Sequence, residues 1–350
     1  MTALMPILLA QIEREGPMTI ADYMAFCLHH PSHGYYATRD PFGAAGDFTT
    51  APEISQMFGE LLGLALAQSW LDQGKPAGLL AELGPGRGTL MADVLRATQN
   101  VTGLHEALQL CLVESSPILR RAQSRALDGH KPAFFDQVSD LPEAPLFLLA
   151  NEFFDALPVR VFQRARSGWD EWRVGASGGQ LSMGRSPAGA VPALANAQGE
   201  FVELCPAAES ISSEIGRRIA QHGGVALIVD YGATESTEPS FQAVQAHQKI
   251  DPLSQPGAAD LTAHVAFGPI LRAAHPAIGF GPVDQREFLA RLGIEVRAQQ
   301  LAAGLTGAAL RQHKAALLRL TDPEEMGTLF KVIGLAPPGA AAPPGMEPAP

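Results

Sequence analysis

The sequence contains few cysteines and lacks the common metal-binding motifs. Its three cysteines, Cys27, Cys111 and Cys205, lie far apart and form no C-x-x-C pair. The sequence therefore predicts neither a disulfide framework nor a cysteine zinc site, and a reducing compartment is expected. Histidines cluster at His29–His33 near Cys27, but the H-E-x-x-H spacing of a zinc site is missing. We interpret them as the end of a helix and expect no metal.

Long blocks of lysine and arginine are also missing, and the formal net charge is −11. Such a charge disfavours nonspecific binding to nucleic acid or anionic membranes, and it favours cationic ligands and basic peptides. No apolar stretch is long enough to span a bilayer, and the N-terminal segment lacks the basic start and cleavage site of a signal peptide. We therefore expect a soluble, cytoplasmic protein, with import into an organelle left open.

What is present is the composition of a globular α/β protein, with 46% hydrophobic and 17% charged residues. Apolar residues recur at three- and four-residue spacing up to about residue 70, which predicts helices. From residue 79 onward, short apolar runs alternate with helix-like segments, and this alternation is typical of a parallel sheet wound with helices. The predicted strands are 79–82, 108–113, 133–135 and 146–150, followed by 224–232 and 329–336, with helices at 210–222 and 285–293.

Less regular segments divide this pattern. We expect an N-terminal helical cap with a lid loop over residues 1–75, a main domain over 76–335, and insertions at about 166–209 and 233–280. The lid loop runs from His30 to Glu53 and is rich in glycine and proline, as functional loops often are. The last segment, 336–350, is dominated by alanine and proline and is expected to be disordered.

A glycine-rich loop follows the first strand of the main domain. It reads E-L-G-P-G-R-G-T-L from Glu82 to Leu90, so that the glycines follow a G-x-G-x-G pattern. The dinucleotide fingerprint requires G-x-G-x-x-G, and no phosphate-binding P-loop motif occurs in the chain. Glu82 would in addition repel a phosphate and attract a cation. The loop therefore favours a cationic adenosine compound over NAD, and the alternative is a tight turn that binds nothing.

A second acidic residue ends the next predicted strand. Glu114 follows the run 108–113 in L-C-L-V-E-S-S-P. Open α/β sheets bind ligands at the carboxyl ends of their strands, where an acidic residue accepts hydrogen bonds from a ribose diol. The glycine loop and Glu114 together indicate an adenosine ligand.

With further motifs, these segments resemble the MidA-like family of class I S-adenosylmethionine-dependent methyltransferases. The motifs are H-G-Y-Y at 33–36, G-D-F-T-T-A-P-E-I-S-Q-M-F-G-E at 46–60, N-E-F-F-D-A-L-P-V at 151–159, L-I-V-D-Y-G at 227–232 and G-A-A-D-L-T-A-H-V-A-F at 257–267. The resemblance extends over roughly residues 10–335. It implies a Rossmann-like, doubly wound α/β fold with a mainly parallel seven-stranded sheet, an N-terminal helical cap and insertions.

The resemblance also implies the cofactor, S-adenosylmethionine, and its product, S-adenosylhomocysteine. The glycine loop would hold the methionine end of the cofactor, and Glu114 would hold the ribose. Glu82 would either orient the loop or contact the amino group of the methionine moiety. Asp136, next to Gln137, is a candidate near the adenine, with a surface turn as the alternative. The full set of expected cofactor-binding residues is Glu82, Gly84, Pro85, Gly86, Gly88, Thr89, Leu90, Glu114, Ser115, Asp136 and Asn151.

Catalytic candidates follow the fourth strand of the predicted sheet. Asn151, Glu152 and Asp155 stand there, and two carboxylates three positions apart can grip an arginine guanidinium and accept its proton. The alternative is that both acids cap the start of a helix. Asp47 in the lid loop and His264 are further catalytic candidates. Four more residues could complete the pocket, namely Asp230, Tyr231, Asp260 and Thr262.

The resemblance implies a protein arginine N-methyltransferase that acts on a subunit of respiratory complex I during assembly. In the mitochondrial members, the mitochondrial matrix would be the compartment. The alternative is an assembly chaperone that binds S-adenosylmethionine and a partner with little or no turnover. The acidic residues of Asn151–Asp155 favour the enzyme, because a pure binder does not need them. Whether the protein is a homodimer is left open by the sequence.

Overall fold

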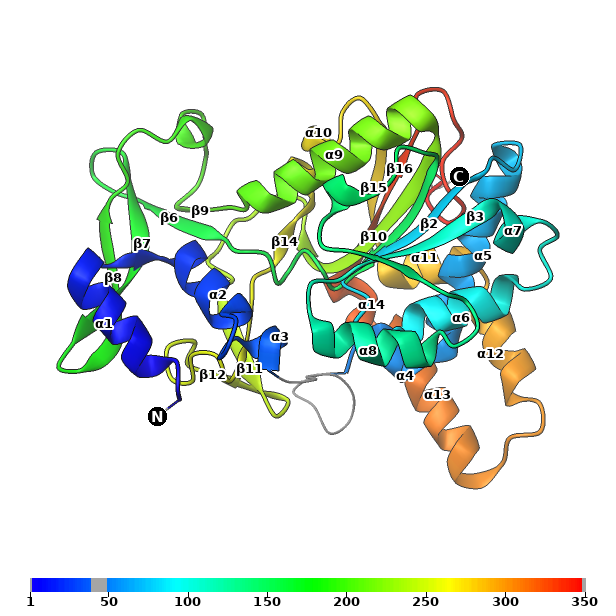
Figure 1. The fold of residues 1–350 in the computed structure, drawn as a ribbon, viewed down its shortest axis with the longest axis horizontal. Coiled ribbons are helices and arrows are strands. Elements are labelled where there is room, and N and C mark those ends of the chain that lie inside the picture. The colour runs from blue at the N-terminus through cyan, green and yellow to red at the C-terminus, as the bar shows by residue number, and fades with distance from the viewer. Residues whose placement is uncertain (1, 39–48, 348–350) are drawn as a thin grey trace. The chain divides into compact units, whose positions relative to one another are not determined.

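The computed structural model describes residues 2–38 and 49–347. The chain forms two compact units, each assembled from separate stretches of sequence (Figure 1). Unit 1 combines Met1–Phe48, Asp155–Ala208 and Thr234–Ala266. Unit 2 combines Thr49–Phe154, Glu209–Ala233 and Phe267–Pro350. Within the described ranges, no helix is both long and apolar enough to cross a membrane.

Unit 2 contains the predicted sheet, with seven of its strands in the order β15-β16-β10-β5-β2-β3-β4. The five strands from β10 to β4 are parallel to one another, while β16 runs antiparallel to both β10 and β15. The mainly parallel seven-stranded sheet is thereby confirmed. The bounds are β2 (Gly78–Leu83), β3 (Leu108–Val113), β4 (Ala133–Phe135), β5 (Leu146–Asn151), β10 (Gly224–Ala233), β15 (Ile278–Asp284) and β16 (Phe330–Ala336).

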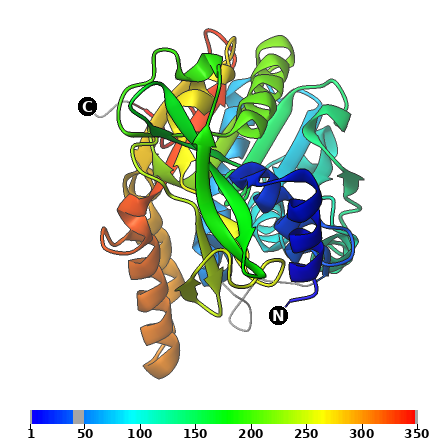
Figure 2. The same ribbon diagram turned by 90° about the vertical axis from the view of Figure 1, so that its left-hand side faces the viewer.

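Helices cover this sheet because its strands are apolar on both faces. Leu80, Leu149 and Leu227 share one core with helices α5 and α6, while Leu148 and Ile228, whose side chains point the other way, are also fully buried. Figures 1 and 2 show α9 running alongside the sheet. The helices are α4 (Ala51–Ile54), α5 (Gln56–Asp72), α6 (Thr89–Thr98), α7 (Leu104–Ala107), α8 (Pro117–Ala126), α9 (Pro206–His222), α10 (Phe267–Ala273), α11 (Gln285–Arg291), α12 (Ile294–Ala302), α13 (Gly307–Thr321) and α14 (Met326–Leu329), with the 3₁₀ turn η1 (Val138–Asp140).

Unit 1 has a separate core, in which the N-terminal helices pack with the inserted strands. A capping box between Thr19 and Asp22 starts α2 directly after β1. Its larger sheet has the order β1-β7-β6-β9 with β8 on β7, and its smaller sheet has the order β12-β11-β13. The elements are α1 (Met5–Glu15), α2 (Ile20–His29), α3 (Tyr35–Thr38), β1 (Met18–Thr19), β6 (Arg160–Arg164), β7 (Trp169–Ser177), β8 (Gln180–Pro187), η2 (Pro192–Leu194), β9 (Phe201–Leu204), β11 (Gln242–Gln245), β12 (Gln248–Ile250), β13 (Asp260–Thr262) and β14 (Val265–Ala266).

These two units differ from the expected domains, which were continuous stretches of sequence with boundaries after residues 75 and 335. The N-terminal helices α1 and α2 share a core with Val174 of the first insertion and with Leu261 of the second. Helix α5, which the sequence places in the cap, contributes Trp70 and other apolar residues to the core of the sheet. Periodicity along the chain locates such elements but does not show which of them share a core.

The expected disorder of the C-terminal segment is wrong for residues 337–347. Met346 is buried in the core of unit 2, and a Cβ atom on Gly334 would lie only 3.2 Å from its Cγ. Arg291 of α11 donates to the Glu347 carbonyl at 2.7 Å. One apolar anchor and backbone hydrogen bonds thus order a segment whose composition favours disorder.

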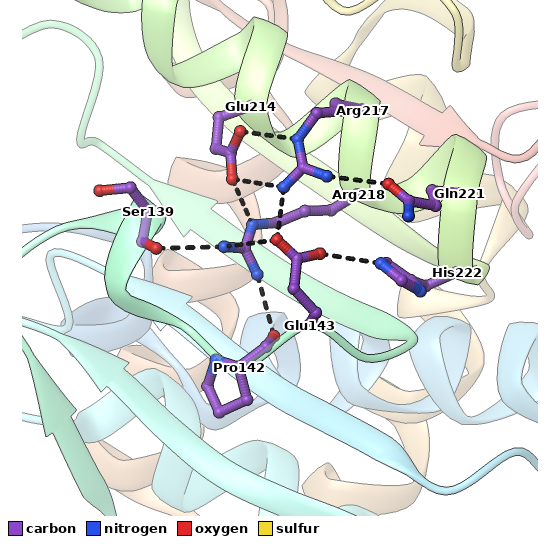
Figure 3. A network of polar contacts seen from close by, with 8 residues as sticks. All are labelled: Ser139, Pro142, Glu143, Glu214, Arg217, Arg218, Gln221 and His222. Carbon is purple, nitrogen blue, oxygen red and sulfur yellow. Dashed lines mark hydrogen bonds and ion pairs between the residues drawn. The ribbon is translucent and has the colours of Figure 1, made fainter.

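A polar network fixes the C-terminal half of α9 to the loop before β5 (Figure 3). Arg218 is almost completely buried and donates to the carbonyls of Pro142 at 2.9 Å and Ser139 at 3.2 Å. Its Nε donates to Glu214 at 2.6 Å. The more exposed Arg217 donates to Glu143 and Glu214. The network therefore joins one buried arginine to a set of surface ion pairs.

Candidate functional site

The glycine loop of unit 2 joins β2 to α6 through residues with positive φ. Gly84, Gly86 and Gly88 have φ values of 57°, 55° and 87°, which side chains other than glycine rarely adopt. The Gly84 N–H donates to the Val113 carbonyl at 3.0 Å, and the Gly88 N–H donates to the Pro85 carbonyl at 2.8 Å. A Cβ atom on Gly84 would lie 2.9 Å from Cδ2 of Phe153. The loop is therefore fixed by its backbone, as the sequence predicts for a loop that a ligand approaches closely.

Glu82 is buried near the end of β2, directly before this loop. Burial and then the nearby Glu114 carboxylate raise the pKa of Glu82 to about 8, although a hydrogen bond from the Met91 backbone lowers it. Its Oε2 has no hydrogen-bond partner among the described residues. A buried carboxyl with an open acceptor and a raised pKa is typical of a functional site.

Glu114 follows β3 and is also buried. Its Oε1 accepts from the Ser116 N–H at 2.7 Å, and its Oε2 accepts from the Gln123 amide at 3.1 Å. Burial raises the pKa of Glu114, while these donors and the Arg120 guanidinium lower it. The carboxylate is thus held in one orientation at the carboxyl edge of the sheet, where the sequence predicts the ribose contact.

Gln123 is a residue of this site that the sequence analysis missed. It is fully buried on α8, and its amide also donates to the Gly86 carbonyl at 2.8 Å. No motif points to it, because its role depends on which face of α8 abuts the loop.

Asn151 is the last residue of β5, beside β10, and Glu152 follows it. The Glu152 N–H donates to the Val229 carbonyl at 2.9 Å, which extends the pairing of the two strands. Glu152 itself has a φ of 49°, a strained value for a residue with a side chain. Its Oε1 accepts from the Asn151 amide at 3.0 Å and from the Ala51 N–H at 3.2 Å. The structure therefore holds the Glu152 carboxylate at the edge where the sheet binds ligands.

Asp230 fixes the segment that follows Glu152. Its side chain is fully buried near the end of β10. One carboxylate oxygen accepts from the Phe154 N–H at 3.0 Å, and the other accepts from the Tyr231 N–H at 2.9 Å. Asp230 thus positions the backbone of Asn151–Phe154 in unit 2, whereas the sequence suggested that it completes the pocket.

The alternative that Glu152 and Asp155 cap a helix directly after β5 is wrong. Residues 152–157 form bends and turns, and the next regular element is strand β6. No helix begins in this described segment, so neither carboxylate caps a helix there. Glu152 instead accepts from the N–H of Ala51, the first residue of α4, which is distant in sequence.

Asp155 belongs to unit 1, where it lies near another predicted residue, Asp260. The Asp155 carbonyl accepts from the Ala263 N–H at 3.0 Å, just after β13. The Tyr36 hydroxyl donates to Asp260 Oδ1 at 2.9 Å. Burial and the carboxylates of Asp260 and Asp155 raise the pKa of Tyr36. Unit 1 thus brings together two buried carboxylates and a tyrosine that are distant in sequence.

The remaining predicted residues have other environments. Thr89 donates its hydroxyl to Glu53 of α4 at 2.5 Å, and Leu90 is buried in the core of unit 2. Ser115 is exposed. The exposed Asp136 is paired with Arg120 at 2.7 Å, so that its carboxylate is held at the surface.

In unit 1, Thr262 is buried, and His264 is exposed, with its N–H donating to the Ser240 hydroxyl. The described residues do not include Asp47, and the part of the lid loop from 39 to 48 also lies outside them.

A pocket of about 630 Å³ opens elsewhere in unit 1, between α1, α2 and β7. His29 and His30 line it together with Glu15 and Asp22. Asp22 is engaged in the capping box of α2, and Glu15 is paired with Arg14. No residue predicted to be catalytic or to bind the cofactor lines this pocket.

The residues at the edge of the unit 2 sheet fit S-adenosylmethionine. Among the described residues, Glu82 Oε2 and Asn151 Oδ1 are buried acceptors without a hydrogen-bond partner. The cofactor has an ammonium group, two ribose hydroxyls and an adenine amine as donors, and its net charge suits a site with two buried glutamates. The loop with positive φ values supplies the close backbone approach.

This fold and site define a class I, S-adenosylmethionine-dependent methyltransferase. A family model described as "Putative S-adenosyl-L-methionine-dependent methyltransferase" matches residues 61–282. The chain belongs to this family.

Relatives match the chain over nearly its whole length. The "Protein arginine methyltransferase NDUFAF7, mitochondrial" of Mus musculus is 38% identical, with 96% of this chain and 85% of the relative covered. The protein of that name from Homo sapiens is 37% identical, covering 96% and 84%. A crystal structure of a Burkholderia thailandensis protein bound to S-adenosyl-homocysteine has a TM-score of 0.83 at 28% identity, covering 99% of this chain and 93% of that one.

Proposed function

We propose that this enzyme is a protein arginine N-methyltransferase. The observation that carries the proposal is Glu152, a carboxylate on a strained backbone at the end of β5, held by two hydrogen bonds. Strain of about 1–3 kcal/mol persists where the surrounding structure maintains it for function. The names of the relatives, which describe arginine methyltransferases, support the same substrate.

The residues of this chain would bind the cofactor, align the arginine side chain and take up its proton. S-adenosylmethionine supplies the methyl group from its sulfonium. Glu82, Glu114, Asn151 and the glycine loop would hold the cofactor. A guanidinium is a weak nucleophile until one nitrogen is localised, and carboxylates that accept its N–H groups both orient it and take up the released proton. We assign this role to Glu152 and Asp155.

The substrate would be a subunit of respiratory complex I, modified during assembly, as the family resemblance implies. The relatives named above are mitochondrial, so the mitochondrial matrix is the expected compartment in a eukaryotic cell, and the cytoplasm in a bacterium. The net charge of −11 suits a basic segment that carries the target arginine. A homodimer is compatible with this role but is not required by it.

The test uses purified protein, S-adenosylmethionine with a labelled methyl group, and an extract from a strain in which the gene is deleted. We expect formation of S-adenosylhomocysteine and label in methylarginine after hydrolysis of the protein fraction. Cofactor binding without any labelled arginine would contradict the proposal, and it would favour an assembly chaperone with little or no turnover. Label in lysine or in a carboxyl group would also contradict it.

A further inference from the structure

Gln123 connects two parts of the cofactor site that are far apart in sequence. Its Nε2 donates to the Gly86 carbonyl at 2.8 Å and to Glu114 Oε2 at 3.1 Å. Gln123 itself is fully buried on α8. One amide group therefore holds both the centre of the glycine loop and the carboxylate that ends β3.

The packing around Gln123 leaves this amide little freedom. A Cβ atom on Gly88 would lie 3.3 Å from Gln123 Cα and 3.4 Å from Ala126 Cβ, so α8 lies directly against the end of the loop. Both partners of Nε2 are acceptors, which fixes the orientation of the amide. Its Oε1 is buried and has no hydrogen-bond partner among the described residues. An unsatisfied buried oxygen destabilises a fold, so a side chain chosen only to fill this space would be apolar.

We propose that Gln123 is a positioning residue for S-adenosylmethionine, which fixes the Gly86 backbone and the Glu114 carboxylate in the arrangement that the cofactor requires. Such preorganisation raises affinity because the ligand does not have to order the site on binding. The inference rests on the cofactor site of the proposed enzyme and is independent of the methyl acceptor.

The charges around Glu114 make this role measurable. Glu82 faces it from β2, and Arg120 of α8, itself paired with Asp136, also faces it. Burial raises the pKa of Glu114, whereas the N–H donors of Ser116 and Gln123 favour the ionised form and lower it. Loss of the Gln123 donor should therefore raise this pKa further. Because the ionised Glu114 carboxylate would accept from the ribose hydroxyls, affinity for the cofactor should fall with decreasing pH. In a variant without the Gln123 amide, this fall should occur at a higher pH.

The experiment measures S-adenosylhomocysteine binding by calorimetry at several pH values for three variants. Gln123→Met keeps the length of the side chain and removes both hydrogen bonds. For Gln123→Met we expect binding at neutral pH to be weaker by roughly tenfold or more. The pH at which affinity falls on acidification should be higher than in the wild type. Gln123→Glu places a carboxylate against Glu114 and should bind more weakly still. Ser124→Ala, an exposed position on the same helix, should behave as the wild type.

Wild-type affinity in Gln123→Met would overturn the inference. Uniformly weaker binding with an unchanged pH profile would also overturn it, because the amide would then only fill space. If Gln123→Met does not fold, the nearly isosteric Gln123→Glu decides, and wild-type binding by that variant contradicts the proposal. Since the readout is binding, a failure to methylate arginine would refute the proposed function and leave this measurement intact.

Discussion

At the scale of single residues, the conformation of Glu152 is the feature that most needs a functional reason. Its φ of 49° follows directly on the last rung of pairing between β5 and β10. Three groups hold the residue in this state, namely the Ala51 N–H, the Asn151 amide and the Val229 carbonyl. The surrounding structure thus overrides the local preference of the backbone, as is common at active sites.

The roles of Glu152 and Asp155 can be tested by replacing each acid with its amide. Glu152→Gln and Asp155→Asn should retain the fold and the affinity for S-adenosylhomocysteine, because neither amide removes a residue that binds the cofactor in this account. Methyl transfer should fall by roughly 10²-fold or more, since each amide lacks the charge and the basicity of the acid.

Steady-state rates with a verified arginine substrate measure the effect. Glu238→Gln, which removes one exposed charge in unit 1, is the control and should be silent. Near-normal turnover in both amide variants would place the catalytic centre elsewhere.

Glu82 gives the stability of the free protein a specific pH dependence. Its pKa is about 8 in the folded protein against an ordinary value of 4.5. Below pH 4.5 the carboxyl is protonated in both states. Between pH 4.5 and 8 only the unfolded state ionises readily, so the wild type loses stability with rising pH relative to a variant without the acid.

We therefore expect Glu82→Gln to raise the melting temperature of the cofactor-free protein, and to raise it more at pH 8 than at pH 5. Calorimetric melting of both proteins across this range measures the difference. A constant difference at all pH values, or a stabilising effect that is larger at acidic pH, would contradict the assigned pKa.

The sequence identified those site residues whose position follows from strand order. Glu82, Glu114 and Asn151 each stand at or near the end of a parallel strand, and such ends meet at one edge of a sheet. Gln123 could not be predicted in this way, because a helix residue contacts the loop only through the rotation and tilt of α8. The environment of Asp136 was also not predictable, since its pairing with Arg120 depends on the same helix.

At the scale of elements, α9 illustrates how a buried charge ties a helix to a loop (Figure 3). Arg218→Met should destabilise the fold by about 1–3 kcal/mol, because the hydrogen bonds of the buried guanidinium to the Pro142 and Ser139 carbonyls and to Glu214 would be lost. Arg217→Met should change stability by about 1 kcal/mol or less, since its side chain is 41% exposed. Chemical denaturation of the two variants measures this contrast, and equal losses would contradict it.

The C-terminal segment provides a second test at this scale. Met346 is 3% exposed, so Met346→Ala should lower the free energy of unfolding by about 2–5 kcal/mol, the range for buried methionine. Met183→Ala on β8, where the side chain is 38% exposed, should stay within about 0.5 kcal/mol of the wild type. If Met346→Ala is as stable as the wild type, the segment does not contribute to the core.

Element prediction succeeded where a pattern was both apolar and short. The strands expected at 108–113 and 133–135 have those bounds in the structure. The C-terminal segment was mispredicted because composition averages over residues, whereas one buried methionine and the hydrogen bonds from Arg291 fix this segment. The small strands β11 to β14 were missed because polar residues, glycine and proline interrupt the apolar pattern in this part of the chain.

At the scale of the whole molecule, the chain passes between two units several times. Unit 2 holds the predicted cofactor residues, and unit 1 holds Asp155, Asp260 and Tyr36. The family resemblance predicted the mainly parallel seven-stranded sheet, and the structure adds the order of its strands. It did not predict that the N-terminal helices share a core with both insertions, because no local pattern reports contacts between residues that are distant in sequence.

The central claim is that this methyltransferase modifies arginine, and mass spectrometry of the proteome tests it most directly. A strain without the gene would be compared with its parent and with strains that carry either the wild-type gene or Glu152→Gln. The account predicts at least one methylarginine site that disappears on deletion, returns with the wild-type gene and does not return with the variant. An unchanged set of methylarginine sites after deletion would contradict it.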